Sequence, residues 1–342
     1  MTLHPTVLAD GWYAQYLGDK VTLLDQLIQQ RYPAWLVRLA ARSGLVRGLL
    51  LFWFGRSYEA IVMSTGFLMV LLLEAWVGRR GRRVVVLEFI RRQPSGWRRL
   101  IYPMWFQLIV KPATVRAMRV GRVLSHWEVD HYACMFQVPR DRFQFIAWPT
   151  RGEGDCLPRF NDASDTPMVL SSGRVACDWD TLFRAAEGRG WPLTVVCRKR
   201  DLSHVQRLNR NGRARILCDI GAAEHQELLS CATVYVMSMK ELVGSSGHIR
   251  LANAVRAGVP VVSTNIRSLD GYIINGETGL LVEPGDWVAL REAIERLLAD
   301  PGQRDRLRTR AFVQGDGWTQ HLASVRTLVQ NAISNSLIHD IR

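Results

Sequence analysis

Short apolar segments that are typical of buried strands alternate with helical patterns from about residue 57 onward. In the first half the expected strands are EAIVMST, RRVVVLEF, RVLSHW and RFQFIAW, with helices over FLMVLLLEAW and residues 97–118. In the second half they are PMVLSS, PLTVVC, ARILCDI, TVYVMS and VPVVST, separated by helical segments such as HQELLSCA. Such alternation predicts parallel sheets covered by helices on both faces. We therefore expect an α/β fold with two doubly wound, Rossmann-like domains facing across a cleft.

The domain boundary is predicted where this periodicity stops. Turn-forming residues dominate TRGEGDCLPRFNDASDT, which places a linker over 151–166. The N-terminal domain then covers 1–150 and the C-terminal domain 167–316. A C-terminal helix is expected over 317–342, in a position to pack back on the first domain. Residues 1–50 are expected to be helical, as in LLDQLIQQRY and WLVRLAAR.

The formal charge of +13 is unevenly distributed. Residues 1–150 contain 20 Lys and Arg against 9 Asp and Glu, whereas residues 151–342 contain 24 against 22. A basic first half predicts an anionic partner, for which anionic lipid, a lipid diphosphate and nucleic acid all qualify. The segment GRRGRRVVVLEFIRRQPSGWRRLIYPMWFQLIVKP mixes eight arginines and a lysine with Trp97, Tyr102, Trp105 and Phe106. This mixture favours an anionic membrane surface over nucleic acid, and a solvated helix face with core aromatics is the plainer alternative.

The cellular location is predicted from cysteine spacing and hydropathy. The six cysteines show no paired spacing and several lie in strand-like runs, so we expect buried free thiols in a reducing compartment. The most apolar run, Ala60 to Leu73, is shorter than the roughly 20 residues that span a bilayer. We expect a cytoplasmic protein, peripheral on the inner face of the cell membrane.

The segment GSSGHIRLANAVRAGVPVV, at 244–262, places a glycine-serine loop between a buried strand and an amphipathic helix. A helix N-terminus offers unpaired N–H groups and a positive dipole end to a phosphate. Gly247 would allow close backbone approach, while Ser245, Ser246 and His248 would supply donors. Helix capping by the same residues is the alternative.

This segment resembles the donor-binding domain of GT-B glycosyltransferases, especially glycosyltransferase family four. Ala257, Gly258 and PVV at 260–262 match the family's turn, and NGETGLLVEPGD matches the stretch that follows it. PMVLSSGRVACDWDTLFRAAE resembles the opening of the same domain, which would place Gly173 and Arg174 at the pyrophosphate. In the first half, SHWEVDHYACMFQVPRDRFQFI resembles the family's closing helix and strand. The resemblance covers most of residues 57–312.

The chain departs from the family pattern at several positions. Ser245 and Asn253 occupy the places of two family glutamates, which indicates a divergent branch; Asn253 can still bond the ribose or nearby sugar hydroxyls. Arg198 and Lys199, after the next strand, could replace a missing family lysine as phosphate ligands. The opening strand and Gly-Gly loop of the family's first domain have no expected counterpart here.

Candidate catalytic groups lie at strand ends of the first domain. Glu88, in VVVLEFIRR, could act as a base or stabilise an oxocarbenium ion, or could pair with Arg91 or Arg92. His126 and Glu128 are further candidates, with a structural cap as their alternative role. The DWD at 178–180 is expected to cap a helix rather than bind metal, and no metal is expected.

The sequence as a whole predicts a metal-independent glycosyltransferase of the hexosyltransferase type. The resemblance implies a nucleotide diphosphate sugar, with UDP- or GDP-sugar expected, as the co-substrate and no other cofactor. It also implies retention of anomeric configuration. The expected acceptor is a lipid-linked or cell-envelope saccharide. Two alternatives stay open: a DNA-modifying glycosyltransferase of the same fold, and a non-catalytic binding protein, which the replaced glutamates would explain.

Overall fold

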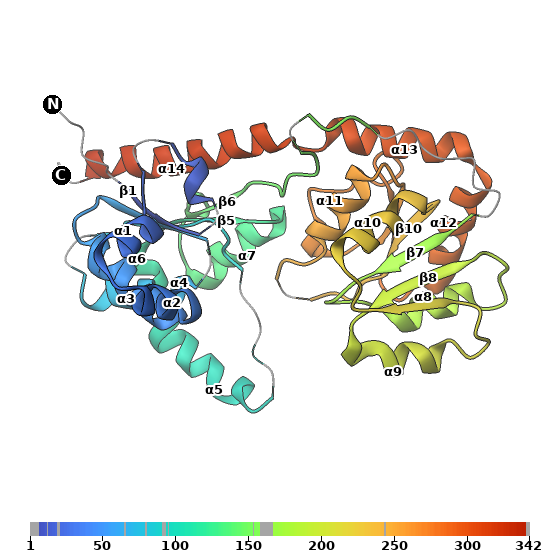
Figure 1. Cartoon of the computed structure of the whole chain (residues 1–342), viewed down its shortest axis with the longest axis horizontal. Helices are drawn as coiled ribbons and strands as arrows, with labels where there is room; N and C mark the ends of the chain where they lie inside the picture. Colours follow the sequence, from blue (N-terminus) through green and yellow to red (C-terminus); the bar gives the residue numbers. More distant parts are fainter. Residues whose placement is uncertain are drawn as a thin grey trace. The chain divides into compact units, whose positions relative to one another are not determined.

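The computed structural model describes residues 7–339 except 12, 19–20, 65, 79–80, 91–93, 95, 153, 158–166 and 243. It forms two compact units (Figure 1). Unit 1 comprises residues up to Ile146 together with those from Leu322, and unit 2 runs from Ala147 to His321. The boundaries therefore fall at 146/147 and 321/322, where the sequence analysis placed them near 150 and 316. Most of the expected linker lies outside the described residues.

Unit 1 contains a six-stranded sheet in which every pair of neighbours is parallel. The strand order is β2-β1-β3-β4-β5-β6. The strands are β1 (Val7–Asp10), β2 (Val21–Leu23), β3 (Ala60–Met63), β4 (Val84–Val86), β5 (Met118–Val123) and β6 (Phe143–Phe145). Parallel strands place their carboxyl ends at one edge of the sheet, and this edge is where ligands bind in doubly wound folds.

The expectation that residues 1–50 are helical is wrong for β1 and β2. All four residues of β1 are buried, and the strand lies between β2 and β3 in the sheet. A four-residue strand buried on both faces has no apolar-polar alternation, so periodicity does not reveal it. The opening strand of the resembled family is therefore present, and Gly11 follows it with a φ of +97°.

Several helices of unit 1 contact their neighbours. The helices of this unit are α1 (Leu24–Arg31), α2 (Ala34–Arg42), α3 (Gly44–Gly55), α4 (Phe67–Trp76), α5 (Arg98–Trp105), the π-helical segment η2 (Phe106–Val110), α6 (Lys111–Ala117), α7 (His126–Phe136) and α14 (Trp318–His339). Helix α3 contacts α4, α4 contacts α6, and η2 connects α5 to α6 along the chain. Figure 1 shows α5 extending away from the sheet.

Unit 2 repeats the architecture with the strand order β12-β11-β10-β7-β8-β9, again all parallel. Its strands are β7 (Val169–Ser172), β8 (Leu193–Cys197), β9 (Arg215–Cys218), β10 (Val234–Met237), β11 (Val261–Thr264) and β12 (Leu280–Val282). Its helices are α8 (Trp179–Ala186), α9 (Lys199–Leu208), α10 (Ala222–Cys231), α11 (His248–Arg256), α12 (Trp287–Ala299) and α13 (Pro301–Gln314). Each unit thus has its own doubly wound sheet.

The cysteines are free thiols, but the expectation that they are buried is wrong for most of them. Only Cys197, on β8, is fully buried, whereas Cys134, Cys156 and Cys231 are exposed. Cys134 and Cys231 are residues of α7 and α10. A cysteine near the end of an apolar run can therefore still face solvent. Within the described residues, no helix is both long enough and apolar enough to cross a membrane.

Candidate functional site

The loop before α11 reaches the carboxyl edge of the unit 2 sheet. Gly247 is the N-cap of α11 and has a φ of +95°, a left-handed conformation that glycine adopts without strain. A Cβ there would lie 3.2 Å from the side chains of Met237 and Met239. The backbone therefore requires glycine on two grounds, conformation and space. Ser245 and Ser246, just before it, are half-buried.

His248 holds this loop in place. Its Nε2 lies 2.7 Å from the carbonyl oxygen of Ser268, and its ring packs on Tyr272 with a centroid distance of 4.7 Å. Ser268 also donates to the carbonyl oxygen of Ser246 over 3.2 Å. Because the imidazole is buried and its Nε2 is engaged, the side chain acts on the shape of the loop. Since Nε2 already interacts with Ser268, this nitrogen does not support the phosphate-donor role that the sequence suggested for His248.

A second loop, after β7, lies at the same edge because β7 and β10 pair side by side. Gly173 begins it, and Arg250 from the first turn of α11 crosses over it. Arg250 donates to the carbonyl oxygens of Ser172 over 2.9 Å and of Val175 over 3.2 Å. A Cβ on Gly173 would overlap both the Arg250 guanidinium and the Cys177 thiol. A larger residue at this position would displace the end of the Arg250 side chain or the Cys177 thiol, so glycine permits this close approach. Arg250, which the sequence analysis missed, joins the two loops.

Arg174 follows Gly173 and its side chain is exposed. Burial lowers the pKa of His225, on α10, and the positive charge of Arg174 lowers it further. The imidazole is therefore neutral near pH 7. Its Nε2 lies 2.8 Å from Ser172 Oγ, which in turn lies 2.7 Å from the buried Tyr235 hydroxyl. This neutral network supports the loop and leaves the arginine as the charged group above it.

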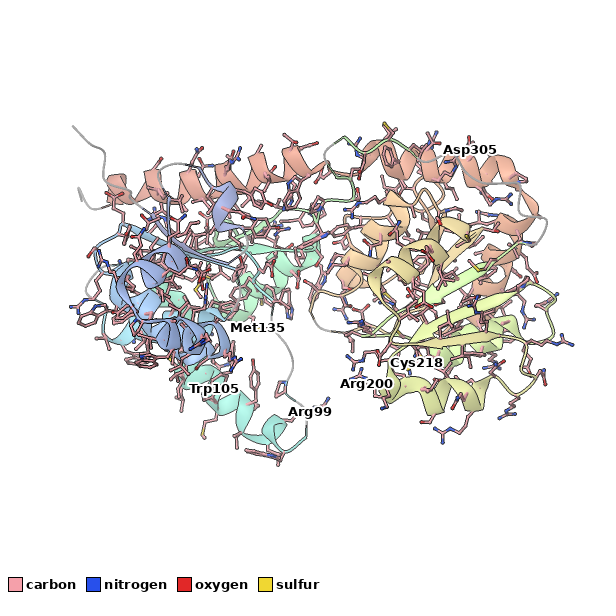
Figure 2. The ribbon with its side chains drawn as sticks, viewed as in Figure 1. Arg99, Trp105, Met135, Arg200, Cys218 and Asp305 are labelled. Carbon is pink, nitrogen blue, oxygen red and sulfur yellow. The ribbon has the colours of Figure 1, made fainter. Side chains whose placement is uncertain are left out.

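Arg198 and Lys199 stand at the start of α9, directly after β8. Arg198 is the N-cap and is half-buried, while Lys199 is exposed. The backbone N–H of Lys199 donates to Asp219 Oδ2 over 3.1 Å. The neighbouring Arg200 is labelled in Figure 2, and it donates to the carbonyl oxygen of Arg174 over 3.4 Å. The β7 and β8 loops therefore gather positive charge at one end of the sheet.

Asn253 lies on α11 and is half-buried. It is one and a half turns into a helix whose N-terminus borders the two loops, so its position fits a hydroxyl group farther from the phosphate. The sequence analysis expected it to bond the ribose or nearby sugar hydroxyls, and this stays a prediction.

The helix-cap prediction for the DWD segment is confirmed. Asp178 is the N-cap of α8, and its carboxylate accepts from the backbone N–H of Thr181 over 3.3 Å and from the Thr181 hydroxyl over 2.8 Å. Asp180 is exposed and lies 3.1 Å from His204. Within the part of the chain that the structure describes, no group of three His, Cys, Asp or Glu side chains is arranged to hold a metal ion.

In unit 1, Glu88 follows β4 at the carboxyl edge and is half-buried. It acts on Tyr13, whose pKa burial raises to about 12, with the charge of Arg122 opposing the shift and that of Glu88 adding to it. Arg122 is fully buried and donates to the Tyr13 hydroxyl over 2.8 Å and to the Ile146 carbonyl over 3.0 Å. Glu88 therefore lies near the buried pair of Tyr13 and the Arg122 guanidinium. Its suggested partners Arg91 and Arg92 lie outside the described residues.

Glu128 has the structural role rather than the catalytic one. It is completely buried in α7, where one oxygen accepts from the Leu124 backbone N–H over 3.1 Å and the other from the Tyr132 hydroxyl over 3.2 Å. His126 is exposed at the first position of the same helix, and its ring packs on Phe145 with a centroid distance of 4.0 Å. Of this pair, only His126 can reach a substrate.

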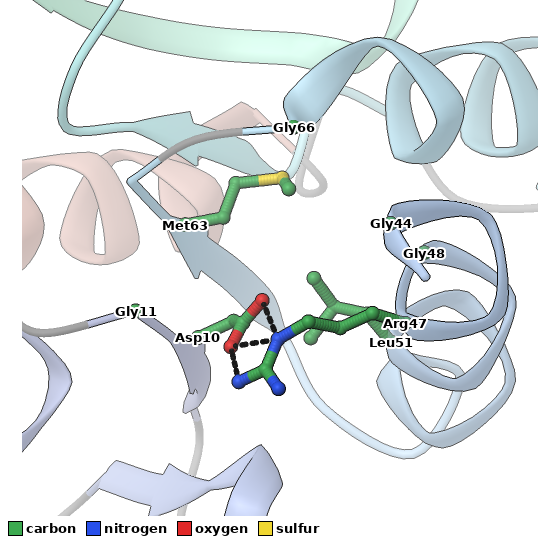
Figure 3. Close-up of a pocket in the computed structure, with 8 residues that line it drawn as sticks. All are labelled: Asp10, Gly11, Gly44, Arg47, Gly48, Leu51, Met63 and Gly66. Atoms are coloured by element: carbon green, nitrogen blue, oxygen red, sulfur yellow. Dashed lines mark hydrogen bonds and ion pairs between the residues drawn. The ribbon is translucent and has the colours of Figure 1, made fainter. Parts of the chain in front are cut away.

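A cavity of about 280 Å³ opens at the ends of β1 and β3, lined by Asp10, Gly11, Gly44, Arg47, Gly48, Leu51, Met63 and Gly66. Figure 3 shows Arg47 extending from α3 to the carboxylate of Asp10. Arg47 Nε lies 2.9 Å from each Asp10 oxygen, and this pairing raises the pKa of the guanidinium. A further hydroxyl, Ser64 Oγ, is buried without a hydrogen-bond partner among the described residues. It would be 2.6 Å from a Cβ on Gly11.

Asp10, Arg47 and Ser64 were not identified from the sequence. The sequence holds one local signal of this site, because the acidic Asp10 and then Gly11 follow a buried apolar run. This run was too short to be recognised as a strand. Arg47 offered no local signal, because its partner is 37 residues away. Polar groups that converge on a cavity at the ligand-binding edge form a second candidate site, this one in unit 1.

Comparison with known proteins shows what parts of the chain are similar to. Residues 202–314 match the family model described as Glycosyl transferases group 1. The chain is 45% identical over 47 residues to the capsular polysaccharide biosynthesis glycosyltransferase CapM of Staphylococcus aureus, covering 14% of this chain and 12% of that protein. It is 29% identical over 161 residues to the lipopolysaccharide core biosynthesis glycosyltransferase LpsE of Rhizobium meliloti (strain 1021), covering 44% and 45%. The chain therefore matches less than half the length of each relative.

The fold of the whole chain has solved counterparts. Anabaena HepE in complex with UDP-glucose matches 96% of this chain and 99% of its own with a TM-score of 0.64 and 13% identity. The two parallel six-stranded sheets with flanking helices are those of a GT-B fold. The expected fold class is confirmed. The family resemblance is confirmed for GT-B glycosyltransferases, and the replacement of the two glutamates stays a prediction.

Proposed function

We propose that this GT-B protein, whose residues 202–314 belong to Glycosyl transferases group 1, transfers a sugar from a nucleotide diphosphate sugar to a cell-envelope saccharide. The observation that carries the proposal is the joined pair of loops in unit 2. Gly247 adopts a left-handed conformation that favours glycine, Gly173 allows the Arg250 side chain to approach closely, and Arg250 fixes one loop against the other. A glycine-walled helix N-terminus surrounded by arginines is suited to a diphosphate.

The leaving diphosphate would be stabilised by groups already in place. Arg174 is exposed beside the loop, Arg198 and Lys199 begin the next helix, and the N–H groups at the start of α11 point toward the same edge. Preorganised cations and dipoles of this kind stabilise charge that develops in a transition state. This arrangement supports our proposal that the reaction is metal-independent. Ser245 would donate to the diphosphate with the rest of its loop, and Asn253 would bond the ribose or nearby sugar hydroxyls.

Unit 1 would supply the acceptor site and the acid-base chemistry. The cavity with the Asp10–Arg47 pair suits the hydroxyl groups of a saccharide. The Ser64 hydroxyl, which has no hydrogen-bond partner among the described residues, lies beside the lining residue Gly11. Glu88 and His126 are the candidate catalytic groups, and retention of anomeric configuration is the outcome that the family resemblance implies. The names of the relatives, a capsular polysaccharide enzyme and a lipopolysaccharide core enzyme, support a cell-envelope or lipid-linked acceptor.

The donor is expected to be a UDP- or GDP-sugar, and HepE was solved with UDP-glucose. A thermal-shift panel with UDP, GDP, ADP, dTDP and CDP tests this directly. A diphosphate at about 100 times its dissociation constant should stabilise the fold by roughly 2.7 kcal/mol. Arg174→Ala should abolish the shift, while Arg207→Ala, an exposed arginine on α9, should leave it intact.

The panel also separates the rival functions. A shift with one diphosphate, followed by release of that diphosphate from its sugar in the presence of a saccharide acceptor, supports the transferase. Binding without turnover for any saccharide acceptor would contradict transfer and favour a binding protein. The absence of a shift at millimolar concentration would contradict the donor site itself.

A further inference from the structure

Helices α2 and α3 of unit 1 expose apolar side chains in regular stripes. On α2 the exposed stripe is Trp35, Arg38, Leu39 and Arg42, at a spacing that places all four on one face. On α3 it is Leu45, Leu49 and Trp53, followed by Arg56. Trp53 is 63% exposed, and the Arg56 guanidinium lies 5.8 Å from the centre of its ring. The outer faces of both helices therefore combine large apolar groups with arginines.

The segment from α5 through η2 carries a third stripe. Its exposed side chains are Leu100, Ile101, Met104, Leu108 and Ile109, preceded by Trp97. Leu100 is 84% exposed and Trp97 69%. Arg99, on the same helix, is exposed and labelled in Figure 2. Trp76, at the end of α4, is also exposed and has the Arg116 guanidinium 4.8 Å from its ring centre. A soluble surface rarely exposes this much contiguous helix-borne apolar area.

These stripes belong to one helical layer, because α2 packs on α3, α3 on α4, and α4 on η2. The residues differ from those that composition alone suggested. Of the aromatics in the basic cluster, Phe106 is buried, and Tyr102 and Trp105 pack against the core. Arg83 is buried in an ion pair with Glu74. For the three aromatic residues, the plainer alternative is therefore correct: their rings belong to the hydrophobic core or pack against it.

The segments that carry the stripes contain basic residues and no acidic ones, and an exposed carboxylate near them, Asp25 of α1, pairs with Arg47 of α3. Residues 31–58 and 89–127 contain no Asp or Glu, and they carry five and eight basic residues. A face of arginines and tryptophans around aliphatic side chains matches the interface of a bilayer that contains anionic lipid. A second copy would bring the same charges together, which opposes association. Nucleic acid would leave the leucines and Met104 exposed to water, because phosphates and bases offer them no apolar partner.

We propose that the layer formed by α2, α3 and α5–η2 docks on an anionic lipid bilayer. The side chains of Trp35, Trp53, Leu49 and Leu100 enter the interface, and the arginines between them contact lipid phosphates. The helices lie in the plane of the membrane, since none of the described ones can span it. This docking is independent of the proposed transfer reaction, because it requires neither donor nor acceptor.

Co-sedimentation of the full chain with vesicles tests the proposal. We expect binding to phosphatidylglycerol–phosphatidylcholine vesicles that greatly exceeds binding to phosphatidylcholine alone. The pair Leu49→Gln and Trp53→Gln should weaken it on the order of 100-fold, from lost apolar insertion. The pair Arg38→Gln and Arg42→Gln should weaken it roughly thirtyfold and flatten its salt dependence. Val313→Gln, an equally exposed apolar position on α13 of unit 2, is the matched control and should bind as the wild type does.

Circular dichroism melts establish that each variant is folded, so a loss of binding reports on the surface. The proposal is overturned if the wild type fails to sediment with anionic vesicles, or if the α3 variant binds them as well as the control does. It is also overturned if Trp53→Gln instead dissolves a dimer seen by light scattering, or abolishes binding to duplex DNA, while vesicle binding is unchanged. Nucleotide-diphosphate binding should be unaffected in all these variants, which separates this result from a failure of the donor site.

Discussion

Unit 1 and unit 2 each contain a six-stranded parallel sheet, but the groups at the carboxyl edges of the two sheets differ. In unit 2 the edge consists of glycine loops over a neutral network of Ser172, His225 and Tyr235, with arginines above. In unit 1 the carboxyl edge holds charged groups, as in the pair of the buried Asp10 with the half-buried Arg47. A second pair, Glu74–Arg83, is fully buried and lies at the amino end of β4. The comparison shows that two sheets of the same parallel type can carry different groups at this edge: glycine loops suited to an anion, or paired fixed charges. The loops and helices that cover each sheet make the difference.

The surfaces differ in the same way. Most of the exposed large apolar side chains are in unit 1, on α2, α3 and α5–η2, and unit 1 also carries most of the excess positive charge. The surface of unit 2 has fewer such groups, which is consistent with the proposal that this unit binds a small polar molecule. Substitutions that affect one unit and not the other would support this difference between the units. Substitutions that affect both units alike would contradict it.

The largest effect is expected from Arg83→Met. Arg83 donates to both carboxylate oxygens of Glu74, over 2.6 and 2.7 Å, and both side chains are buried. Removing the cation leaves an uncompensated buried charge, which costs about 3–5 kcal/mol. Urea unfolding followed by circular dichroism should move the unit 1 transition and leave the unit 2 transition in place.

An exposed ion pair serves as the control for that experiment. Arg140 pairs with Asp130 over 2.7 Å on the surface of unit 1, and Arg140→Met should change stability by less than about 1 kcal/mol. A comparable loss in the two variants, or a shift of both transitions by Arg83→Met, would contradict the distinction between buried and exposed charge.

A smaller effect, confined to unit 2, is expected from Gly247→Ala. The left-handed backbone costs an alanine about 1–2 kcal/mol, and its Cβ would crowd Met237 and Met239 at 3.2 Å. We expect that loss of stability together with loss of the diphosphate thermal shift. Gly212→Ala is the matched control, because Gly212 has a φ of +62° with no atom within 4 Å of a Cβ. It should lose stability but keep the shift; loss of the shift in both would argue against a local cradle.

The smallest effect is a pH dependence from His225. Its pKa in the folded state is lowered by burial and by Arg174, below the ordinary 6.5. The unfolded chain therefore binds the proton first as pH falls, and the stabilisation present above about pH 6.5 is lost below it. His225→Gln should flatten the fall in melting temperature of unit 2 between about pH 7 and pH 5.5. Scanning calorimetry checks this, and parallel curves for the two proteins would count against a neutral His225.

Much of the fold could be predicted from the sequence, but unevenly. The alternation of strands and helices in unit 2 was found because most of its strands are apolar runs of four or five residues between clear helical patterns. Strands β1 and β2 were missed because Val7–Asp10 has only three apolar residues before Asp10, and β2 leads directly into α1 with no turn residue between them. The expected strand at 122–127 begins earlier, at Met118, and ends at Val123, since SHW belongs to the turn into α7.

The candidate site divides in the same manner. Gly173 and Gly247 could be found because each lies in a short motif between a strand and a helix. A loop that favours glycine is visible in such a local stretch of sequence. Glu128 was ambiguous, because a glutamate at the start of a helix has the same local sequence whether it is catalytic or capping. Burial and its two hydrogen bonds decided for the cap.

What the sequence by itself determined is local: where backbones turn, which segments are apolar, and how charge is distributed between the halves. Only the tertiary structure decided which side chains meet. Arg122 reaches Tyr13 across 109 residues, Arg250 reaches Ser172 across 78, and Arg47 reaches Asp10 across 37. Such pairings follow from the order of strands in a sheet, which no local periodicity encodes. The exposed stripes of α2 and α3 are of the same kind, because an apolar helix face is read as core until the fold leaves it uncovered.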